Sequence, residues 1–176
     1  MRNAKLLAAV AALTLAAAAV WAAPPRARWR TATSEELRRV IPARAPVIKE
    51  NIETEFRTAS GVIDNRGRFI AGVVMITAGY SAEGKYSHFF LTQAPLRVGE
   101  VDLPAGQYVF GYARASDDSI RVSFYRAATG DAVGDVEARR STRKGGGVRS
   151  LLINPPVGGK ANIQIGRFLL EYHVAE

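Results

Sequence analysis

The chain has 176 residues, with 24 lysines and arginines against 16 aspartates and glutamates, a net charge of +8, and no cysteine. Because the chain has no thiol, it cannot form disulfides, thiolate zinc sites or cysteine nucleophiles. The positive charge favours anionic partners without specifying one.

The first residues have the pattern of a secretory signal peptide. Arg2 and Lys5 form a short positive region, residues 6–23 are almost entirely apolar, and the exit Val20-Trp21-Ala22 ends in a small residue. This order predicts an export signal that is cleaved after Ala22. An uncleaved anchor is the alternative, although the alanine-rich run is at the lower edge of membrane-spanning length. We therefore expect an exported protein, periplasmic or secreted, with no transmembrane span after cleavage.

A basic arm and one short helix are expected next. The stretch "APPRARWR" has no apolar periodicity and is typical of a flexible lead. Thr33, with Glu36 three residues later, forms a capping box, which predicts a short helix that ends before Pro42 and packs over one end of the remaining fold. The expected organisation is a signal peptide at 1–22, the arm and helix at 23–50, and a single antiparallel β domain at 51–176.

The remainder has the turn residues of an antiparallel β protein. Segments rich in glycine, asparagine and aspartate separate apolar stretches at short spacing, and no long helical pattern intervenes. The predicted fold class is mainly β, either an antiparallel β-sandwich or an up-and-down β-barrel of about eight strands. Strands are expected at 53–63, 68–79, 85–93, 107–115, 119–126, 132–139, 148–154 and 161–174, with a short pair at 96–98 and 101–103.

The stretch "LRVGEVDLPAGQYVFGYAR", residues 96–114, has the features of a hairpin. Gly99 supplies a turn, Pro104 fixes one backbone angle, and Gly106 permits a positive φ before the next strand. The stretch resembles the "LPAGxY" hairpin of exported, largely uncharacterised bacterial β-domains. More distantly, it is similar to transthyretin-like and carboxypeptidase-regulatory-like sandwich modules. The resemblance implies export and a β fold, and these families bring no catalytic residues to transfer.

Aromatic residues alternate along the strand after this turn. Tyr108, Phe110 and Tyr112 share one face, and Gly111 on the other face marks a bend or a close approach to the backbone. Such a stripe usually fills a core. If the sheet closes into a barrel, the same rings, with Phe89, border a cavity for a small apolar ligand, as in a lipocalin-like carrier.

The densest positive charge lies in "ARRSTRKGGGVR", residues 138–149. Basic residues around three glycines indicate a solvated hairpin loop or a docking segment for an anionic partner. That partner would be an envelope component, such as lipopolysaccharide phosphate or an acidic glycan, or an acidic protein. Nucleic acid is not expected, because no aromatic residues interleave the cluster. The candidate anion-binding residues are Arg139, Arg140, Arg143, Lys144 and Arg149.

No catalytic arrangement assembles from the sequence. In "GYSAEG", Ser81 has part of the spacing of a nucleophile elbow, but Glu83 stands where the second glycine belongs and a strand follows instead of a helix. The two histidines, His88 and His173, have no neighbours at metal-ligand spacing. We expect no metal, no cofactor and no enzyme activity, with a serine hydrolase using Ser81 as the third alternative. The preferred function is a non-enzymatic binding module at the bacterial cell envelope.

Overall fold

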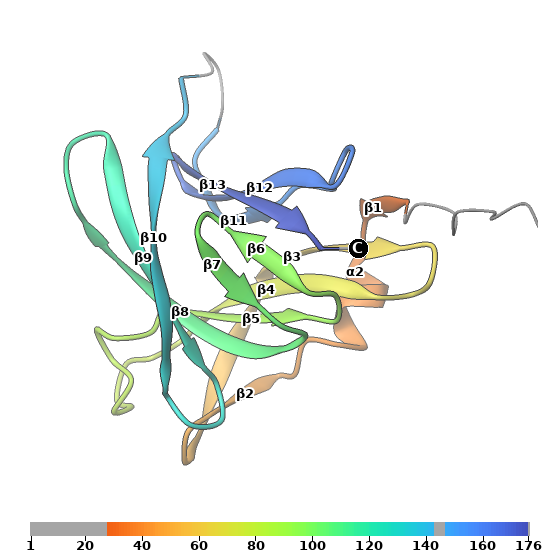
Figure 1. Ribbon diagram of the computed structural model, residues 1–176. Helices are drawn as coiled ribbons and strands as arrows, with labels where there is room; N and C mark the ends of the chain where they lie inside the picture. The colour runs from red at the N-terminus through yellow and green to blue at the C-terminus, as the bar shows by residue number, and fades with distance from the viewer. Residues whose placement is uncertain (1–27, 143–146, 176) are drawn as a thin grey trace, which may run out of the picture.

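A computed structural model describes residues 28–142 and 147–175 (Figure 1). The expected signal peptide and two of the candidate basic residues, Arg143 and Lys144, lie outside these ranges. The mainly β prediction is confirmed, because the described residues form one curled antiparallel sheet, a half-barrel, with a five-residue helix, α2, at Ser34–Arg38.

The described part of the sheet has thirteen strands, where about eight were expected. In chain order they are β1 (Trp29–Thr31), β2 (Arg44–Val47), β3 (Glu50–Asp64), β4 (Phe69–Met75), β5 (His88–Thr92), β6 (Leu96–Val98), β7 (Val101–Leu103), β8 (Gly106–Arg114), β9 (Ser119–Arg126), β10 (Ala132–Arg140), β11 (Arg149–Ile153), β12 (Lys160–Gly166) and β13 (Phe168–Val174). Across the sheet their order is β1-β3-β4-β5-β8-β9-β10-β13-β12-β11, while β2 pairs with β3 and the β6–β7 hairpin joins β13 through β6.

The stretch 161–174, expected as one strand, is a hairpin. Gly166 takes a positive φ of 61° and turns β12 back onto β13. Ile165 and Phe168 pair across this turn. The stretch looks like a single strand in the sequence for two reasons. Its apolar alternation continues through the turn, and the turn lacks the Asn-Gly or Asp-Gly pair that usually marks a tight hairpin.

The turn around Pro104 differs from the prediction at one glycine. Gly99 has the expected positive φ, of 55°, whereas Gly106 does not and simply begins β8. The Tyr108 hydroxyl donates a hydrogen bond to the Pro104 carbonyl at 2.6 Å. This side-chain bond closes the turn, so the left-handed freedom of Gly106 is not used.

The predicted capping box is confirmed. The Glu36 N–H donates to the Thr33 hydroxyl at 3.2 Å, and the Thr33 N–H donates to the Glu36 carboxylate at 2.8 Å. The helix packs Leu37 onto Gly61 of β3, where a Cβ would lie 2.8 Å from a Leu37 methyl carbon. The helix therefore lies on the outer face of β3.

Residues expected in the arm also form strands. β1 pairs with the end of β3, in register Trp29 with Asp64, and β2 pairs with the start of β3, in register Arg44 with Glu53. The register of β3 against β4 shifts between Glu55 and Ser60. The long strand β3 is therefore irregular between the part that pairs with β2 and the part that pairs with β1.

Two hydrophobic clusters lie on the two faces of the sheet. The inner cluster, on the concave side, contains Ile70 of β4, and Phe90 and Phe110 pack edge to face within it. The outer cluster contains Leu37 of α2 and Val73 of β4, and residues 32–52 cover it. Because its successive residues enter both clusters, β4 is apolar on both faces, as its sequence indicates.

The edge strand β11 returns to the inner face of β3 and β4. The Ile153 N–H donates to the Ser60 hydroxyl at 2.8 Å, and both groups are buried. Leu151 belongs to the inner cluster, and one of its methyl carbons lies 3.0 Å from the place a Cβ would take at Gly72. The two ends of the curled sheet are thus joined by a side-chain hydrogen bond and by apolar packing.

Candidate functional site

The four aromatic candidates lie in three different surroundings. Tyr108 and Phe110 are fully buried in the inner cluster, and Phe89 is fully buried in the outer cluster on the opposite face of the sheet. Tyr112 is 51% exposed near the end of β8. The four rings therefore do not line one cavity, and Tyr112 is the member of the set that borders the groove described next.

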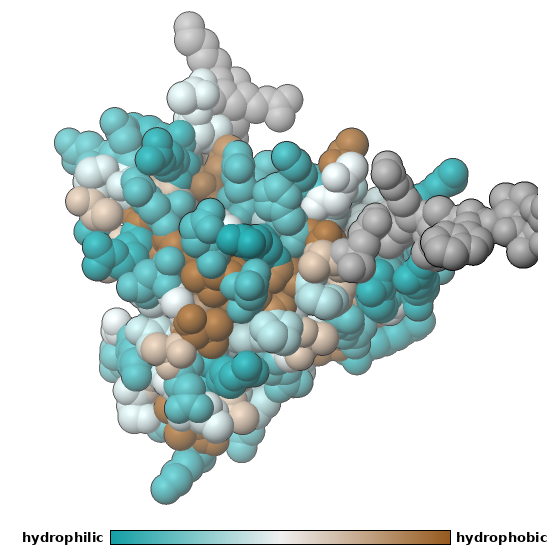
Figure 2. Space-filling model, viewed as in Figure 1, coloured by the Kyte–Doolittle hydropathy of each residue, from teal (hydrophilic) through white to brown (hydrophobic). Residues whose placement is uncertain are grey.

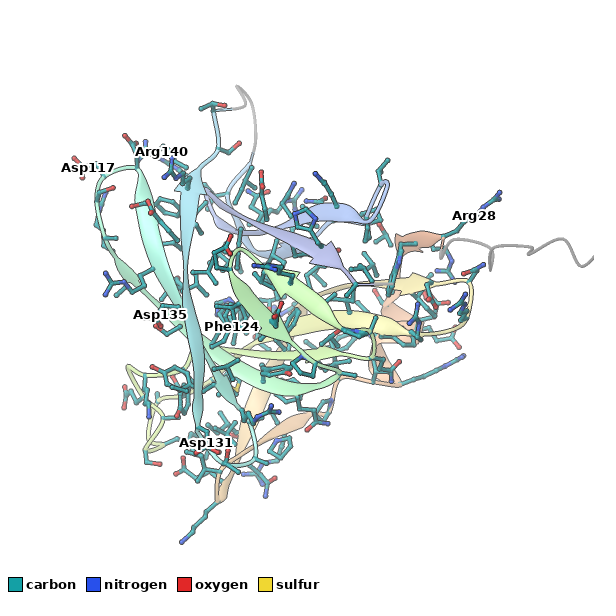
Figure 3. The ribbon with its side chains drawn as sticks, in the orientation of Figure 1. Arg28, Asp117, Phe124, Asp131, Asp135 and Arg140 are labelled. Carbon is teal, nitrogen blue, oxygen red and sulfur yellow. The ribbon has the colours of Figure 1, made fainter. Side chains whose placement is uncertain are left out.

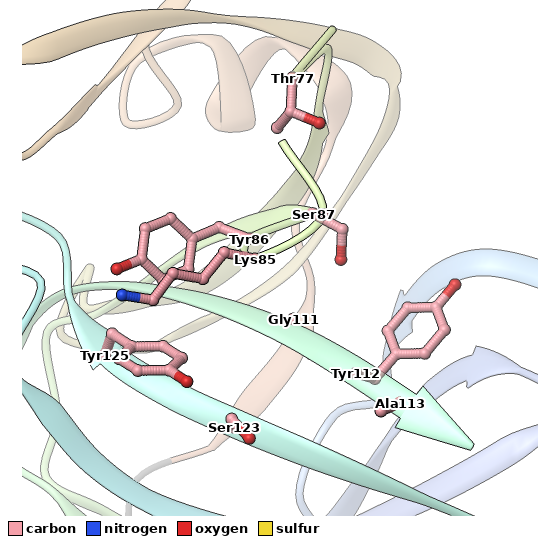
Figure 4. A pocket seen from close by; sticks show the side chains of 10 residues that line it. Thr77, Lys85, Tyr86, Ser87, Gly111, Tyr112, Ala113, Ser123 and Tyr125 are labelled. Carbon is pink, nitrogen blue, oxygen red and sulfur yellow. The ribbon is translucent and has the colours of Figure 1, made fainter. Parts of the chain in front are cut away.

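A surface groove of about 460 Å³ lies where the segment between β4 and β5 crosses the outer face of β8 and β9 (Figure 4). Its walls combine aromatic rings, hydroxyl groups, glycine backbone and one lysine. The lining residues are Thr77, Gly84, Lys85, Tyr86, Ser87, Gly111, Tyr112, Ala113, Ser123 and Tyr125. We call this hollow the tyrosine groove.

Polar contacts tie the loop to the β2–β3 hairpin. The Ser81 hydroxyl donates to the Glu50 carboxylate at 2.7 Å, and the Tyr80 hydroxyl donates to the Glu53 carboxylate. Arg44 forms an ion pair with Glu53 at 3.2 Å. Ser81, the candidate nucleophile of the hydrolase alternative, therefore anchors a loop to a carboxylate instead of meeting a histidine.

Gly111 is the point where the same loop touches the sheet. A Cβ at Gly111 would lie 2.1 Å from the Lys85 carbonyl oxygen, a separation that real Cβ atoms do not reach. The predicted close approach to the backbone at Gly111 is thus confirmed. This contact positions Lys85 and Tyr86 at the groove.

The Lys85 ammonium lies over two tyrosine rings, at 4.9 Å from the Tyr86 centroid and 5.0 Å from the Tyr125 centroid. Such cation–π contacts hold a charged group in place. The nearby Tyr86 hydroxyl raises the pKa of Lys85, although the two groups do not reach hydrogen-bond geometry. The lysine is therefore charged at neutral pH.

The Tyr86 hydroxyl is buried, and it makes no hydrogen bond to any residue within 28–142 and 147–175. It lies beside the β9–β10 turn, since a Cβ at Gly130 would be 3.3 Å from its oxygen. Ile48, at the tip of the β2–β3 hairpin, covers the same glycine and has an unusual positive φ of 57°. A buried hydroxyl without a partner is costly, and such groups are rare in folded proteins.

His88 is buried beside the groove and stacks on Phe110, with 4.5 Å between ring centroids. Its Nδ1 is 2.8 Å from the Ser87 hydroxyl, and its Nε2 is 3.4 Å from the Ser150 carbonyl. Burial lowers the pKa of His88 to about 4. The imidazole is therefore neutral at neutral pH, which makes it a weak proton acceptor for chemistry at Ser87.

The second histidine lies elsewhere in the fold. His173 is half-buried on β13 and pairs with Lys160 and Arg97 on the two neighbouring strands. Among the residues that the structure describes, no group of three or more His, Asp or Glu side chains is arranged to hold a metal ion.

Arginines from three separate segments meet at one end of the sheet. Arg139 and Arg140 end β10 and pair with Leu169 and Phe168 of β13. Phe168 pairs in turn with Ile165 of β12, next to Gly166, and Gly166 pairs with Arg149 of β11. Arg167 occupies the turn between β12 and β13, and its carbonyl accepts from the Ser141 N–H at 2.9 Å. We call Arg139, Arg140, Arg149 and Arg167 the arginine end.

The charges of the arginine end are only partly balanced. Arg140 pairs with Asp118 at 3.4 Å, and Arg139 lies 3.8 Å from Glu137. Arg149 and Arg167 are exposed and form no ion pair with a described residue. Figure 3 places Arg140 beside the hairpin that carries Asp117, and Figure 2 shows that this end is mostly hydrophilic.

The sequence identified Arg139, Arg140 and Arg149 as a cluster, but it missed Arg167. That residue stands alone in "QIGRFL", far from the basic loop in the chain. The turn at Gly166 brings Arg167 close to the other three arginines. Gly166 was therefore the sequence signal for this position, because a turn there places Arg167 at the same end of the sheet.

Comparisons of this chain with protein-family models, with curated proteins and with solved structures found no match. In the described part of the chain, no helix has the length and apolar character that crossing a membrane requires.

Proposed function

We propose that this protein is an exported, non-enzymatic binding module that attaches to a phosphate-bearing surface of the bacterial cell envelope through the arginine end. The observation that carries the proposal is the gathering of four arginines from three segments, two of which have no ion-pair partner among the described residues. Guanidinium groups bind phosphate oxygens with paired N–H donors. Like charges held together repel, and an anionic surface relieves that repulsion.

The spacing of these arginines supports a surface as the partner. Arg140 and Arg149 are separated by two intervening strands, β13 and β12. Neighbouring strands lie about 4.8 Å apart, so the backbones of Arg140 and Arg149 are about 14 Å from each other. A single small anion does not span this distance, whereas a membrane surface with several phosphates does.

Export is supported by the N-terminal pattern of Arg2 and Lys5 followed by the apolar residues 6–23. The direct test is fractionation of cells that produce the protein, followed by mass measurement of the chain found in the exported fraction. We expect a mature chain that starts at Ala23. A cytoplasmic protein that retains residue 1 contradicts export.

The non-enzymatic character is supported by what the candidate nucleophiles contact. Ser81 donates to Glu50, and the Ser87 hydroxyl shares a hydrogen bond with the Nδ1 of His88, whose buried imidazole has a pKa of about 4. A general base works best with a pKa near the operating pH, and His88 is far below it. These contacts are typical of structural hydrogen bonds.

The arginine end is tested with vesicles of phosphatidylglycerol and phosphatidylcholine against vesicles of phosphatidylcholine alone. The double variant Arg149→Gln/Arg167→Gln removes the two unpaired charges. Each arginine near an anionic surface contributes about 1 kcal/mol, so we expect binding to weaken about 30-fold. The matched control is Arg28→Gln/Arg57→Gln, which removes the same charge from exposed positions elsewhere on the fold.

The control variant should bind the anionic vesicles within about twofold of the unchanged protein, because the Arg28 and Arg57 charges lie away from the proposed contact. Equal losses in both double variants would mean that net charge alone drives binding. Equal binding to both kinds of vesicle would also overturn the proposal. Raising the salt concentration should release the unchanged protein, since exposed charges are screened.

A further inference from the structure

We propose that the tyrosine groove binds an acidic sugar, that is, a saccharide ring that carries a carboxylate. This is a second binding site, distinct from the arginine end and independent of the proposed attachment to an anionic surface. The groove is formed by the loop between β4 and β5 and by the outer face of β8 and β9.

The size and lining of the groove fit a ligand of one or two sugar rings. Its volume of about 460 Å³ is within the range of small-molecule sites. The Tyr125 ring offers an apolar face, and Ser123, on the same face of β9, offers a hydroxyl group. Tyr112 borders the groove at the end of β8, with its ring on the side of His88, 6.0 Å away between ring centroids. A sugar ring has the complementary surface, with apolar C–H groups and hydroxyls at its edge. A purely apolar ligand would leave the Ser123 hydroxyl without a partner, whereas the Ser87 hydroxyl already lies 2.8 Å from the His88 Nδ1.

The charge of the groove selects an acid. None of the ten lining residues is acidic, and Lys85 supplies the one formal positive charge among them. The Tyr86 and Tyr125 rings hold its ammonium at the end of the groove that Figure 4 shows. A carboxylate accepts a charge-assisted hydrogen bond from such an ammonium, which is stronger than a bond between neutral groups.

The Tyr86 hydroxyl gives a second reason to place the carboxylate at this end. The residue is 2% exposed, its hydroxyl has no hydrogen-bond partner among the described residues, and Figure 4 shows it next to the Lys85 ammonium. The Lys85 side chain is exposed, so its ammonium is accessible to a ligand in the groove. A carboxylate bound to Lys85 then supplies the acceptor that the hydroxyl lacks.

The groove is held open before any ligand arrives. The Lys85 carbonyl rests on Gly111, and the loop is tied to the β2–β3 hairpin by the Ser81–Glu50 hydrogen bond. A site that is fixed in advance loses less conformational entropy on binding. This supports measurable affinity for a small polar ligand.

To test this, the purified protein is titrated separately with D-glucuronate, D-glucose and acetate at constant ionic strength. NMR measures the shifts of the backbone amide signals. We expect glucuronate to shift the amides of Lys85, Ser87, Gly111 and Ser123. Glucose lacks the carboxylate and acetate lacks the ring, so each should bind at least about tenfold more weakly.

Two variants test the groups assigned to the carboxylate. Lys85→Met should weaken glucuronate binding about tenfold, while the matched control Lys160→Met, at an exposed lysine that starts β12, should leave it unchanged. Tyr86→Phe removes only the unpaired hydroxyl, so it should keep the fold and still weaken glucuronate binding.

The proposal is overturned by any of three results. The first is an affinity for glucose or acetate equal to that for glucuronate. The second is unchanged glucuronate binding by Lys85→Met, and the third is a set of amide shifts that map to the arginine end. The Arg149→Gln/Arg167→Gln variant should bind glucuronate normally. Its behaviour separates the groove from the proposed surface attachment, because either site can fail without the other.

Discussion

The backbone carbonyl of Lys85 rests directly on Gly111, at a distance that leaves no room for a Cβ. The loop that precedes β5 therefore contacts the outer face of β8 at a position where the side chain is only a hydrogen atom. The depth of the tyrosine groove depends on this contact, because it sets how closely Tyr86 and Ser87 approach β8 and β9.

Gly111→Ala should lift this loop and destabilise the protein by about 1–3 kcal/mol, the usual cost of overpacking. Urea unfolding measures the change, and NMR should locate it at residues 84–87. Gly147→Ala is the matched control, since a Cβ there meets no atom within 4 Å. Equal stability of the two variants would show that the loop moves freely away from β8.

The buried His88 should make stability depend on pH. Its folded pKa of about 4 lies below the unfolded value of about 6.5, so the unfolded chain binds a proton first as the pH falls. Stability is complete above pH 6.5 and should drop by about 3 kcal/mol between pH 6.5 and 4. Unfolding by urea across this range measures the drop.

His88→Phe separates this effect from other titrations. Phenylalanine retains a ring to stack on Phe110 but cannot bind a proton. The variant should therefore lose most of the drop between pH 6.5 and 4, while His173→Gln should retain it. An unchanged drop in His88→Phe would assign the pH dependence to other groups.

Asp64 should contribute to stability at lower pH. Burial alone would raise its pKa, but hydrogen bonds from the Arg68 N–H, the Arg68 guanidinium and the Arg66 N–H hold the pKa below its usual value. A lowered pKa gives stability that is present above the unfolded value of about 3.9 and is lost as the pH falls through the folded value. Asp64→Asn should cost about 1–3 kcal/mol at pH 7.

Asp117→Asn is the control for that measurement, because Asp117 is 96% exposed and pairs with Arg114 on the surface. We expect a change below about 0.5 kcal/mol there. Acid unfolding of the Asp64→Asn variant should also lack the part of the transition that lies below pH 4. A variant as stable as the unchanged protein would contradict the assignment.

Ser60 should stabilise the contact between the two ends of the sheet. Ser60→Ala leaves the buried Ile153 N–H without its acceptor, which costs about 1–3 kcal/mol. Hydrogen exchange should become faster at Ile153 before it changes in β8 or β9. Ser150→Ala, at an exposed serine on the same strand β11, serves as the comparison, and its effect should stay within about 0.5 kcal/mol.

Much of the sheet follows from local signals in the sequence. The alternation of Ile120, Val122 and Phe124 against Arg121 and Ser123 predicts one buried and one wet face on β9, and burial confirms it. Such patterns work because successive side chains on a strand point to opposite faces. The capping box of α2 is equally local, since it needs only Thr33 and Glu36.

The rest depends on contacts between distant residues. Trp29 and Arg44 join β3 although the surrounding prolines and arginines are typical of an arm, because β3 offers free backbone groups on that side. Phe89 and Phe110 are equally aromatic in the sequence, yet they enter opposite clusters. The tyrosine groove could not be predicted, because it depends on the contact of Lys85 with the ring of Tyr125, a residue far away in the sequence.

The place of β13 in the sheet has a consequence for the timing of folding. This strand, residues 168–174, lies between β10 and β12 and also pairs with β6, so strands made much earlier depend on it for a neighbour. While the ribosome has not yet released these residues, β10 and β6 keep open edges and the curled sheet remains incomplete. A chain in that state is still unfolded enough to be threaded through a narrow translocation channel, which is what export as we propose it requires.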